Sequence, residues 1–382
     1  MSEASQLLTF AEPRPANVAE LESELASLWR SVAEEGKAGQ AVMRACALTL
    51  LLYVESEDAG REVSGVLGGV TPQNPCRAVV MVARPEAAPP GLTAWISGQG
   101  HLPISGEKQL CCEQVTVVAR GEAVRDLDNV VVPLIVPGLP VVVWWRAGRF
   151  VPPEYFGNIL RLANRVLVDS ARFSAPDIDL LALAAQVQQL AGEVTFADLN
   201  WSRMTPWREL VAQCFDGAES RAYRERLSQV QIEYEQESPR VSAQAGQALL
   251  LTGWLASRLK WQPERTRGEQ GGEGRSFFFK SPQGPVEVRQ IARAFAGSGK
   301  GVCFSLVMKA AGDPAATFTF ERGPDGRMAV LRREIEDRPP VEGASRLEVL
   351  DEVGLVNEEM KFAGRDRIYE EALNMVARMV AA

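Results

Sequence analysis

The chain has 382 residues, more than the roughly 250–300 at which a single core stops growing, so two domains are expected. A hydrophobic fraction of 46% and a charged fraction of 24% exclude a disordered chain. The net charge of −8 disfavours non-specific nucleic-acid binding, and no apolar run of about 20 residues predicts a transmembrane helix. The N-terminal segment MSEASQLLTFAEPRP lacks the basic start and apolar core of a signal peptide, so a cytoplasmic location is expected.

The first part of the chain alternates predicted helices with short apolar strands. Apolar spacing predicts helices at 17–38, 58–68 and 156–164, and the start of another at 121–128. Apolar or alternating runs predict strands at 41–54, 77–84, 92–98, 110–119, 141–145 and 166–169. This alternation is typical of an α/β domain, here with a mixed sheet that is mostly parallel.

The pattern changes after Ser170, and the predicted domains are 1–173 and 174–382. Helices are predicted at 177–191, 206–215 and 244–259, with one or two more in 346–379, while 222–235 fits a strand or a helix. A polar glycine loop is predicted at 268–275. Short strands then follow at 276–280, 286–291, 302–309, 317–322 and 328–332, joined by turn signals. The second domain is therefore predicted to be α+β, with an antiparallel meander.

The chain offers few residues for catalysis. Its single histidine, His101, is predicted in a loop, without the companions of a Ser-His-Asp or Cys-His site. The segment 297–301, GSGKG, departs from a phosphate-binding loop and is predicted as a hairpin loop, and the glycines in 65–69 lack the G-x-G-x-x-G order. We therefore predict no enzyme activity, no cofactor and no metal, although carboxylates or lysines that the fold brings together are left open.

Six cysteines are scattered along the chain, at positions 46, 76, 111, 112, 214 and 303. Their spacing fits no metal site. They are interpreted as buried small side chains in a reducing compartment, with a redox switch as the alternative.

The first aromatic cluster is Trp144, Trp145 and Arg146 at the end of a predicted strand. Neighbours on a strand point to opposite faces, so one indole at most can enter a given core face. Either helices cover the sheet on both sides and bury both rings, or the cluster contacts a ligand or partner at the carboxyl end of the strand.

The second cluster lies in the block 196–210. Thr205 and Pro206 predict the start of a helix, and Trp207 shares an apolar face with Leu210 and Val211. Polar and aromatic residues are denser just before and at the start of this helix than is usual for a core helix: Asp198, Asn200, Trp201, Arg203 and Arg208. Such a helix start favours an anion or a carboxylate.

These residues carry a resemblance to a known family. The run DLNWSRMTPWREL at 198–210 resembles the signature of the OpcA family. Weaker matches in the same order are the turn 74–77, the strand 139–145, the step 168–171 and the helix 253–259. The family's turn has a histidine where this chain has Asn74.

The resemblance implies a non-catalytic protein that binds glucose-6-phosphate dehydrogenase, promotes its oligomeric assembly and raises its activity. It would thereby serve NADPH supply through the oxidative pentose phosphate pathway. In cyanobacterial relatives the activity is tied to thiol redox state, but the cysteines of this chain show no obvious pairing.

The main hypothesis is therefore a protein-binding activator with an exposed patch of aromatic and arginine residues. The residues predicted to contact the partner are Trp144, Trp145, Arg146, Asp198, Asn200, Trp201, Arg203, Trp207 and Arg208. The alternative is a protein or enzyme that binds a sugar phosphate or another phosphometabolite through the block 200–208. A nucleic-acid module is disfavoured by the acidic balance.

Overall fold

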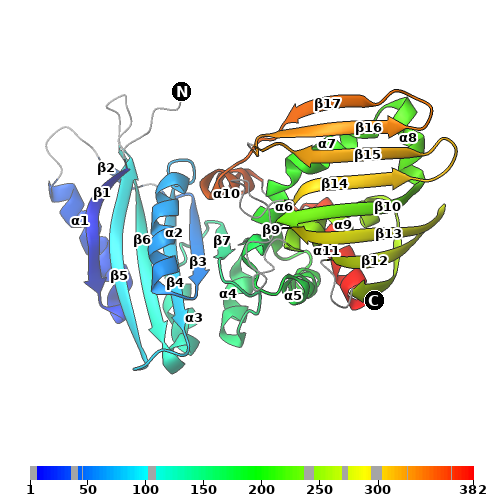
Figure 1. Ribbon diagram of the computed structural model, residues 1–382. Coiled ribbons are helices and arrows are strands. Elements are labelled where there is room, and N and C mark those ends of the chain that lie inside the picture. The colour runs from blue at the N-terminus through cyan, green and yellow to red at the C-terminus, as the bar shows by residue number, and fades with distance from the viewer. Residues whose placement is uncertain are drawn as a thin grey trace.

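The computed structural model describes residues 7–35, 42–44, 46–101, 109–235, 245–268, 274–293, 303–324, 326–362 and 364–382. In these ranges the chain forms two mixed sheets, one of nine strands and one of eight, each packed against helices (Figure 1). The two-domain α/β arrangement expected from the sequence is therefore present. No helix in these ranges combines the length and apolarity needed to span a membrane.

The first sheet is built from strands of the first half of the chain. They are β1 (Leu7–Ala16), β2 (Val42–Arg44), β3 (Leu48–Val54), β4 (Cys76–Arg84), β5 (Gly91–His101), β6 (Gln109–Arg120), β7 (Val141–Trp145), β8 (Arg165–Val168) and β9 (Thr195–Asp198). The order is β1-β5-β6-β4-β3-β7-β8-β9, and β2 pairs with β6. The strands β6-β4-β3-β7-β8-β9 are parallel, in the order of dinucleotide-binding folds, which reverses between β3 and β7.

Helices cover both faces of this sheet. One layer holds α1 (Leu21–Glu35), α3 (Leu127–Val131), α4 (Gly157–Leu162) and α5 (Pro176–Gln189), and the other holds α2 (Glu57–Val70) and α10 (Glu352–Lys361). Successive strand residues point to opposite layers, so Leu51 packs in the first layer and Leu50 and Leu52 in the second. The nearly continuous apolar runs of β3 and β4 reflect this burial on both sides.

The second sheet follows a group of helices. These are α6 (Leu199–Arg203), α7 (Thr205–Cys214), α8 (Ala218–Glu225) and α9 (Ala245–Arg258), with α11 (Arg367–Ala381) at the end of the chain. The strands are β10 (Leu227–Glu235), β11 (Gln262–Gly268), β12 (Gly274–Ser281), β13 (Gly284–Arg293), β14 (Cys303–Ala310), β15 (Ala316–Arg322), β16 (Met328–Ile335) and β17 (Val341–Arg346). Their order is β11-β12-β13-β10-β14-β15-β16-β17. Because β10 inserts between two antiparallel runs and pairs parallel with β13, the sheet is mixed.

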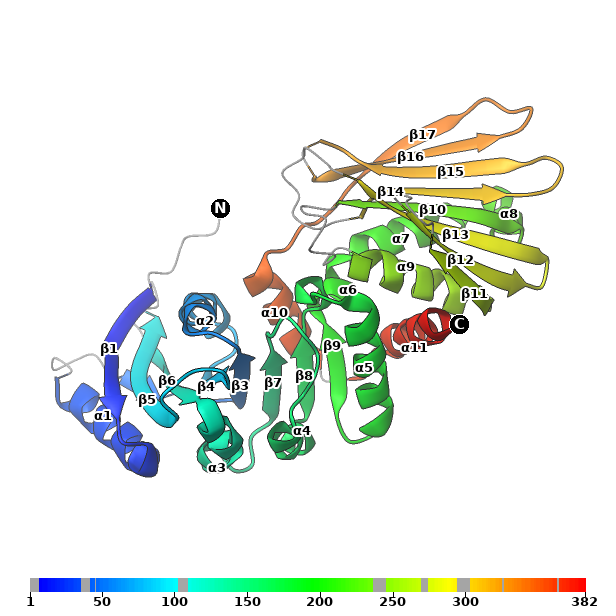
Figure 2. The same ribbon diagram turned by 60° about the horizontal axis from the view of Figure 1, so that its bottom comes forward.

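The chain returns to the first sheet after β17. Figure 1 shows α10 between the two sheets, and Figure 2 shows it beside α2 and the strands β7 and β8. Leu355 and Val356 of α10 are buried in the same cluster as α2. A Cβ atom at Gly69 would lie 2.7 Å from Val353, so the two helices are in close contact there. The C-terminal segment therefore joins the two halves of the molecule.

Most predicted helices and strands are confirmed to within a few residues. The prediction of one strand over 41–54 was wrong, because β2 pairs with β6 whereas β3 pairs with β4 and β7. His101 ends β5 opposite Leu110 rather than lying in a loop, because the β5–β6 pairing continues through the glycines that indicated a turn. The strands β1, β9, β11 and β17 were not predicted.

Two further predictions are not tested by the structure. The predicted loop at 297–301 and most of the glycine loop at 268–275 lie outside the described residues. The boundary between residues 173 and 174 stays a prediction. Both β9 and α10, from the C-terminal side of that boundary, belong to the layers of the first sheet.

Candidate functional site

Trp144 and Trp145 are buried on opposite faces of the first sheet at the end of β7. Trp144 lies in the layer with α2 and α10, whereas Trp145 stacks on Tyr53 with ring centroids 4.2 Å apart. The Trp145 indole Nε1 donates to the Arg149 carbonyl at 2.9 Å. Of the two alternatives that the sequence leaves open, the sheet covered on both faces is the one found.

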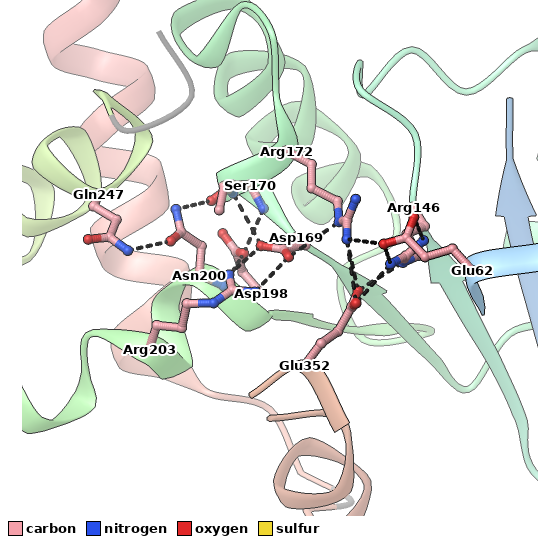
Figure 3. Close-up of polar contacts among 11 residues, drawn as sticks. Glu62, Arg146, Asp169, Ser170, Arg172, Asp198, Asn200, Arg203, Gln247 and Glu352 are labelled. Carbon is pink, nitrogen blue, oxygen red and sulfur yellow. Dashed lines mark hydrogen bonds and ion pairs between the residues drawn. The ribbon is translucent and has the colours of Figure 1, made fainter. Parts of the chain in front are cut away.

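Arg146 follows β7 at the carboxyl edge of the sheet, and its side chain is buried. Its Nε and Nη2 donate to the two oxygens of Glu352 at 2.8 Å each, and Nη2 also donates to Glu62 at 3.1 Å (Figure 3). Arg172 donates to the same Glu352 at 3.3 Å. Burial lowers the pKa of Arg146, but the two carboxylates outweigh it and hold that pKa above its ordinary value. This ion cluster ties the first turn of α10 to the carboxyl edge of the first sheet.

Arg203, at the end of α6, forms a bidentate ion pair with Asp169. Its Nη1 and Nη2 donate to the two carboxylate oxygens at 2.5 and 2.8 Å. Burial raises the pKa of Asp169, but the Arg203 guanidinium lowers it by more, so that pKa lies below its ordinary value. Arg172 Nε lies 3.7 Å from Asp169, which links this pair to the Glu352 cluster.

Asp198 ends β9 and caps α6. Its Oδ1 accepts from the backbone N–H groups of Ser170 at 3.0 Å and Asn200 at 2.9 Å. The Asn200 amide donates to the Ser170 hydroxyl at 3.0 Å and accepts from Gln247 of α9 at 2.8 Å. Gln247 in turn accepts from the backbone N–H of Cys303 on β14 at 2.9 Å. A chain of buried hydrogen bonds therefore runs from the first sheet to the second, as Figure 3 shows in part.

Trp201, Arg208 and Trp207 lie at the corner between α6 and α7. The Arg208 guanidinium stacks over Trp201, 3.6 Å from the ring centroid, and Trp201 Nε1 donates to Asp366 at 2.8 Å. Arg208 forms no ion pair with any described residue, and burial lowers its pKa to about 10. The guanidinium of Arg322 lies 5.8 Å from the ring centroid of Trp207.

The sequence predicted an exposed patch of aromatic and arginine residues, and these aromatic side chains are instead buried. Trp144, Trp145 and Trp207 are at most 2% exposed and Trp201 is 3% exposed. The reason is that both sheets are covered by helices and that the apolar stripe of α7 faces the core. The structure brings Asp198, Asn200 and Arg203 into one polar network, places Trp201, Trp207 and Arg208 at its edge, and connects Arg146 through Glu352 and Arg172. The assignment of all nine residues to partner binding stays a prediction.

A groove of about 1550 Å³ opens beside this corner. Its walls are α6 and α7, the turn between β15 and β16, the segment after β17, α10 and the start of α11. Three predicted residues, Trp201, Arg203 and Arg208, line it. We call it the arginine groove after its eight arginines: Arg165, Arg203, Arg208, Arg322, Arg327, Arg346, Arg365 and Arg367.

The arginine groove also carries large apolar side chains that the sequence analysis did not identify. Val349, Phe362 and Ile368 line it and are 63%, 64% and 42% exposed. They lie just before α10, just after it and near the start of α11. Periodicity assigns no face to such residues at helix ends, so no sequence signal marked them as exposed.

The strand order of the first sheet raises the question of a dinucleotide site. In this fold the pyrophosphate lies against glycines in the turn after the first strand and at the following helix N-terminus. Here the turn from β3 to α2 reads Glu55-Ser56-Glu57-Asp58, with no glycine. Gly60 lies further along, within α2, and a Cβ atom there would lie 3.1 Å from Val82 of β4. This glycine therefore serves close helix–strand packing alone.

One N–H group at the start of α2 is already engaged, and acidic side chains lie beside it. The Ser56 hydroxyl accepts from the Ala59 N–H at 3.1 Å, and Glu55 accepts from the Gly148 N–H at 3.1 Å. Glu57 pairs with Arg120 at 2.7 Å, and the arginine contacts lower its pKa by more than burial raises it. Glu55 forms no ion pair with any described residue and places a negative charge in a turn that has no glycine, so the residues do not fit a nicotinamide dinucleotide.

The described residues contain no group of three or more His, Cys, Asp and Glu side chains arranged to hold a metal ion. The thiols of Cys46, Cys76, Cys112, Cys214 and Cys303 are free. Burial raises the pKa of Cys214 to about 11 and that of Cys303 to about 12, so both remain protonated near neutral pH.

Fold and site together define a two-domain α/β protein, built on a dinucleotide-type sheet whose nucleotide turn is acidic. Residues 69–185 match the family model described as the glucose-6-phosphate dehydrogenase subunit N-terminal domain, and residues 194–373 match the corresponding C-terminal domain. The chain belongs to the OpcA family.

Individual relatives agree with this assignment. The OxPP cycle protein OpcA of Synechocystis sp. is 30% identical over 325 residues, which are 82% of this chain and 66% of that protein. The protein of the same name from Synechococcus elongatus is 28% identical over an alignment of 457 positions, covering 99% of this chain and 98% of that one. A crystal structure described as an oxidoreductase from Parabacteroides merdae is 10% identical with a TM-score of 0.51, covering 91% of this chain and 98% of that chain, and shows a shared fold alone.

Proposed function

We propose that this chain is a non-catalytic accessory protein that binds glucose-6-phosphate dehydrogenase, promotes its assembly and raises its activity. The observation that carries the proposal is the match of both OpcA domain models, in order, along the two halves of the chain. The protein would act in the cytoplasm, on the enzyme that begins the oxidative pentose phosphate pathway and supplies NADPH.

The acidic turn after β3 supports a non-catalytic role. A dehydrogenase with this strand order needs a turn that accepts a pyrophosphate, and the turn here has no glycine and carries Glu55. The fold would then serve as a scaffold rather than as a cofactor domain, since function depends on the site and not on the fold.

The mechanism would be thermodynamic linkage. A protein that binds the active, assembled dehydrogenase more tightly than the inactive form shifts the equilibrium toward activity by the ratio of the two affinities. A tenfold ratio corresponds to about 1.4 kcal/mol of coupling.

The predicted partner residues would contribute in two ways. Arg203 and Arg208 line the arginine groove and would contact a docked partner, while the buried Trp201 would hold Arg208 in place beneath it. The buried members, Trp144, Trp145, Arg146, Asp198, Asn200 and Trp207, would act by holding the two sheets and α10 in place.

The test is to mix the chain with the glucose-6-phosphate dehydrogenase of the same organism and follow activity and molar mass by light scattering. We expect a larger species and an activity that rises until the partners are stoichiometric. An inert protein at the same concentration is the control for non-specific stabilisation. Unchanged mass together with unchanged activity would contradict the proposal.

A further inference from the structure

The arginine groove is cationic in a chain that is acidic overall. Its eight arginines face five lining carboxylates, Glu209, Glu348, Glu358, Glu359 and Asp366. Two further carboxylates, Asp169 and Glu370, pair with Arg203 and Arg365, so a formal excess of one positive charge remains. The whole chain carries a net charge of −8. Positive charge is therefore concentrated at this surface, which favours an anionic partner by electrostatic complementarity.

Several of these arginines form no ion pair within the described part of the chain. Arg165, Arg203 and Arg365 form ion pairs with Glu359, Asp169 and Glu370. Arg208, Arg322, Arg346 and Arg367 form no ion pair with any described residue, although Arg208 and Arg322 are half-buried. Burial lowers the pKa of both, and in the case of Arg208 the nearby carboxylates of Asp366, Glu209 and Glu359 offset this only in part. An external carboxylate would supply the missing compensation.

The same groove exposes apolar side chains. Phe362 and Val349 are more than 60% exposed, and Ile368 is 42% exposed. All three line the groove together with the arginines. Exposed apolar residues gathered in one hollow, next to arginines, are typical of protein interfaces.

The size of the groove decides between a small ligand and a chain segment. Pockets for small molecules usually measure about 300–1,000 Å³, whereas this groove measures about 1550 Å³. We propose that the arginine groove is the docking site for an acidic polypeptide segment of a partner protein, a segment that also carries apolar side chains. That the partner is the dehydrogenase rests on the proposed function.

Two substitutions test the two features separately. Arg346→Glu reverses a charge that forms no ion pair with any described residue, and Phe362→Ser removes the most exposed apolar side chain of the groove. The matched controls lie outside the groove: Arg125→Glu, an exposed arginine on the first domain, and Ile178→Ser, which is 59% exposed at the start of α5. Circular dichroism and thermal unfolding confirm that each variant folds.

The affinity for labelled dehydrogenase is measured by microscale thermophoresis at two salt concentrations. We expect each groove variant to bind at least about tenfold more weakly and each control to stay within about twofold of the unchanged chain. The salt dependence of binding should be weaker for Arg346→Glu, because one charge contact is lost. Folded groove variants that bind and activate like the unchanged chain would overturn the docking site and leave the proposed function standing.

If the unchanged chain neither binds nor activates the dehydrogenase, the proposed function fails, and the groove is tested with a fluorescein-labelled peptide of alternating glutamate and leucine. The docking site is supported if the peptide binds and if Arg346→Glu weakens this binding while Arg125→Glu does not. If the peptide does not bind, the docking site is overturned. Glucose 6-phosphate is tested by calorimetry. If it binds, if Arg322→Glu abolishes this binding and if no peptide binds, the groove is a small-anion site and the proposal is overturned. If the chain self-associates and Arg346→Glu abolishes this self-association, the groove binds a second copy of the chain, and the proposal is also overturned.

Discussion

Asp198 shows how one residue of the sequence motif serves the interior of the molecule. It is 1% exposed, and its Oδ1 accepts two backbone N–H groups while its Oδ2 has no hydrogen-bond partner in the described part of the chain. Burial, together with the nearby Asp169 carboxylate, raises its pKa to about 6, against the hydrogen bonds from Ser170 that lower it. A carboxyl whose pKa rises on folding stabilises the folded state below its ordinary pKa, and this contribution is lost as the pH rises through about 6.

Asp198→Asn should therefore make the protein more stable at pH 8 and flatten the fall in stability between pH 4 and pH 6. The amide keeps the Oδ1 acceptor and replaces an ionised oxygen with an NH₂ group. Thermal unfolding over this pH range measures the effect. A variant that loses stability equally at pH 5 and pH 8 would show that the carboxylate is needed for another reason.

At the same scale, the sequence did not reveal the direction of the motif's side chains. Asp198, Asn200 and Arg203 were predicted to contact a partner, which stays a prediction, and in the structure they share one network with Asp169 and Ser170. Residue type and spacing do not reveal whether such groups point into the molecule or to solvent. That depends on α9 and α10, which come from much later in the chain and bury the motif.

At the scale of elements, the contact between α9 and α11 sets how closely the last helix packs. Gly253 lies in the second half of α9, and a Cβ atom there would lie 2.4 Å from the Ala372 carbonyl oxygen and 2.7 Å from Val376. The glycine is thus required by a close approach of two helix backbones. The sequence predicted both helices from their apolar periodicity, but it carried no sign that this glycine marks the point of contact.

Gly253→Ala should destabilise the protein, although alanine is the better helix former by about 1 kcal/mol. Overpacking against a backbone carbonyl costs about 1–3 kcal/mol, so a net loss is expected. Gly65→Ala in α2 is the matched control, because a Cβ atom there meets nothing within 4 Å, and it should stabilise slightly. Urea unfolding of both variants measures whether each substitution raises or lowers the free energy of unfolding. A stabilised Gly253→Ala would mean that α11 can shift away at little cost.

At the scale of the whole molecule, the first sheet has the strand order of a dinucleotide-binding domain, but its turn after β3 lacks the glycines that such a domain uses to bind a pyrophosphate. The turn carries Glu55, and Arg146 at the carboxyl edge is neutralised by Glu62 and Glu352. Glu352 comes from α10, so the C-terminal segment covers the edge at which this class of fold places its ligands.

We therefore expect no saturable binding of NADP⁺ or NADPH to the chain alone, because the turn after β3 has no glycine and carries Glu55. Calorimetry and quenching of tryptophan fluorescence at millimolar nucleotide measure this. A dehydrogenase that binds the same nucleotide tightly serves as the positive control. Saturable binding at micromolar concentration would contradict the assignment of the turn and reopen an enzymatic role.

The two-domain α/β organisation, most helices and strands, and the family could be predicted from the sequence, because apolar periodicity and a thirteen-residue motif are local properties of the chain. What the motif faces and which surface stays open depend instead on how distant segments pack together. Trp201 packs against Tyr369 of α11, and Trp207 lies near Arg322 of β15, so their burial depends on segments distant in the sequence. The exposure of Phe362 and Val349 depends on where α10 begins and ends. Exposure is a property of the assembled layers, and no spacing of residues along one segment encodes it.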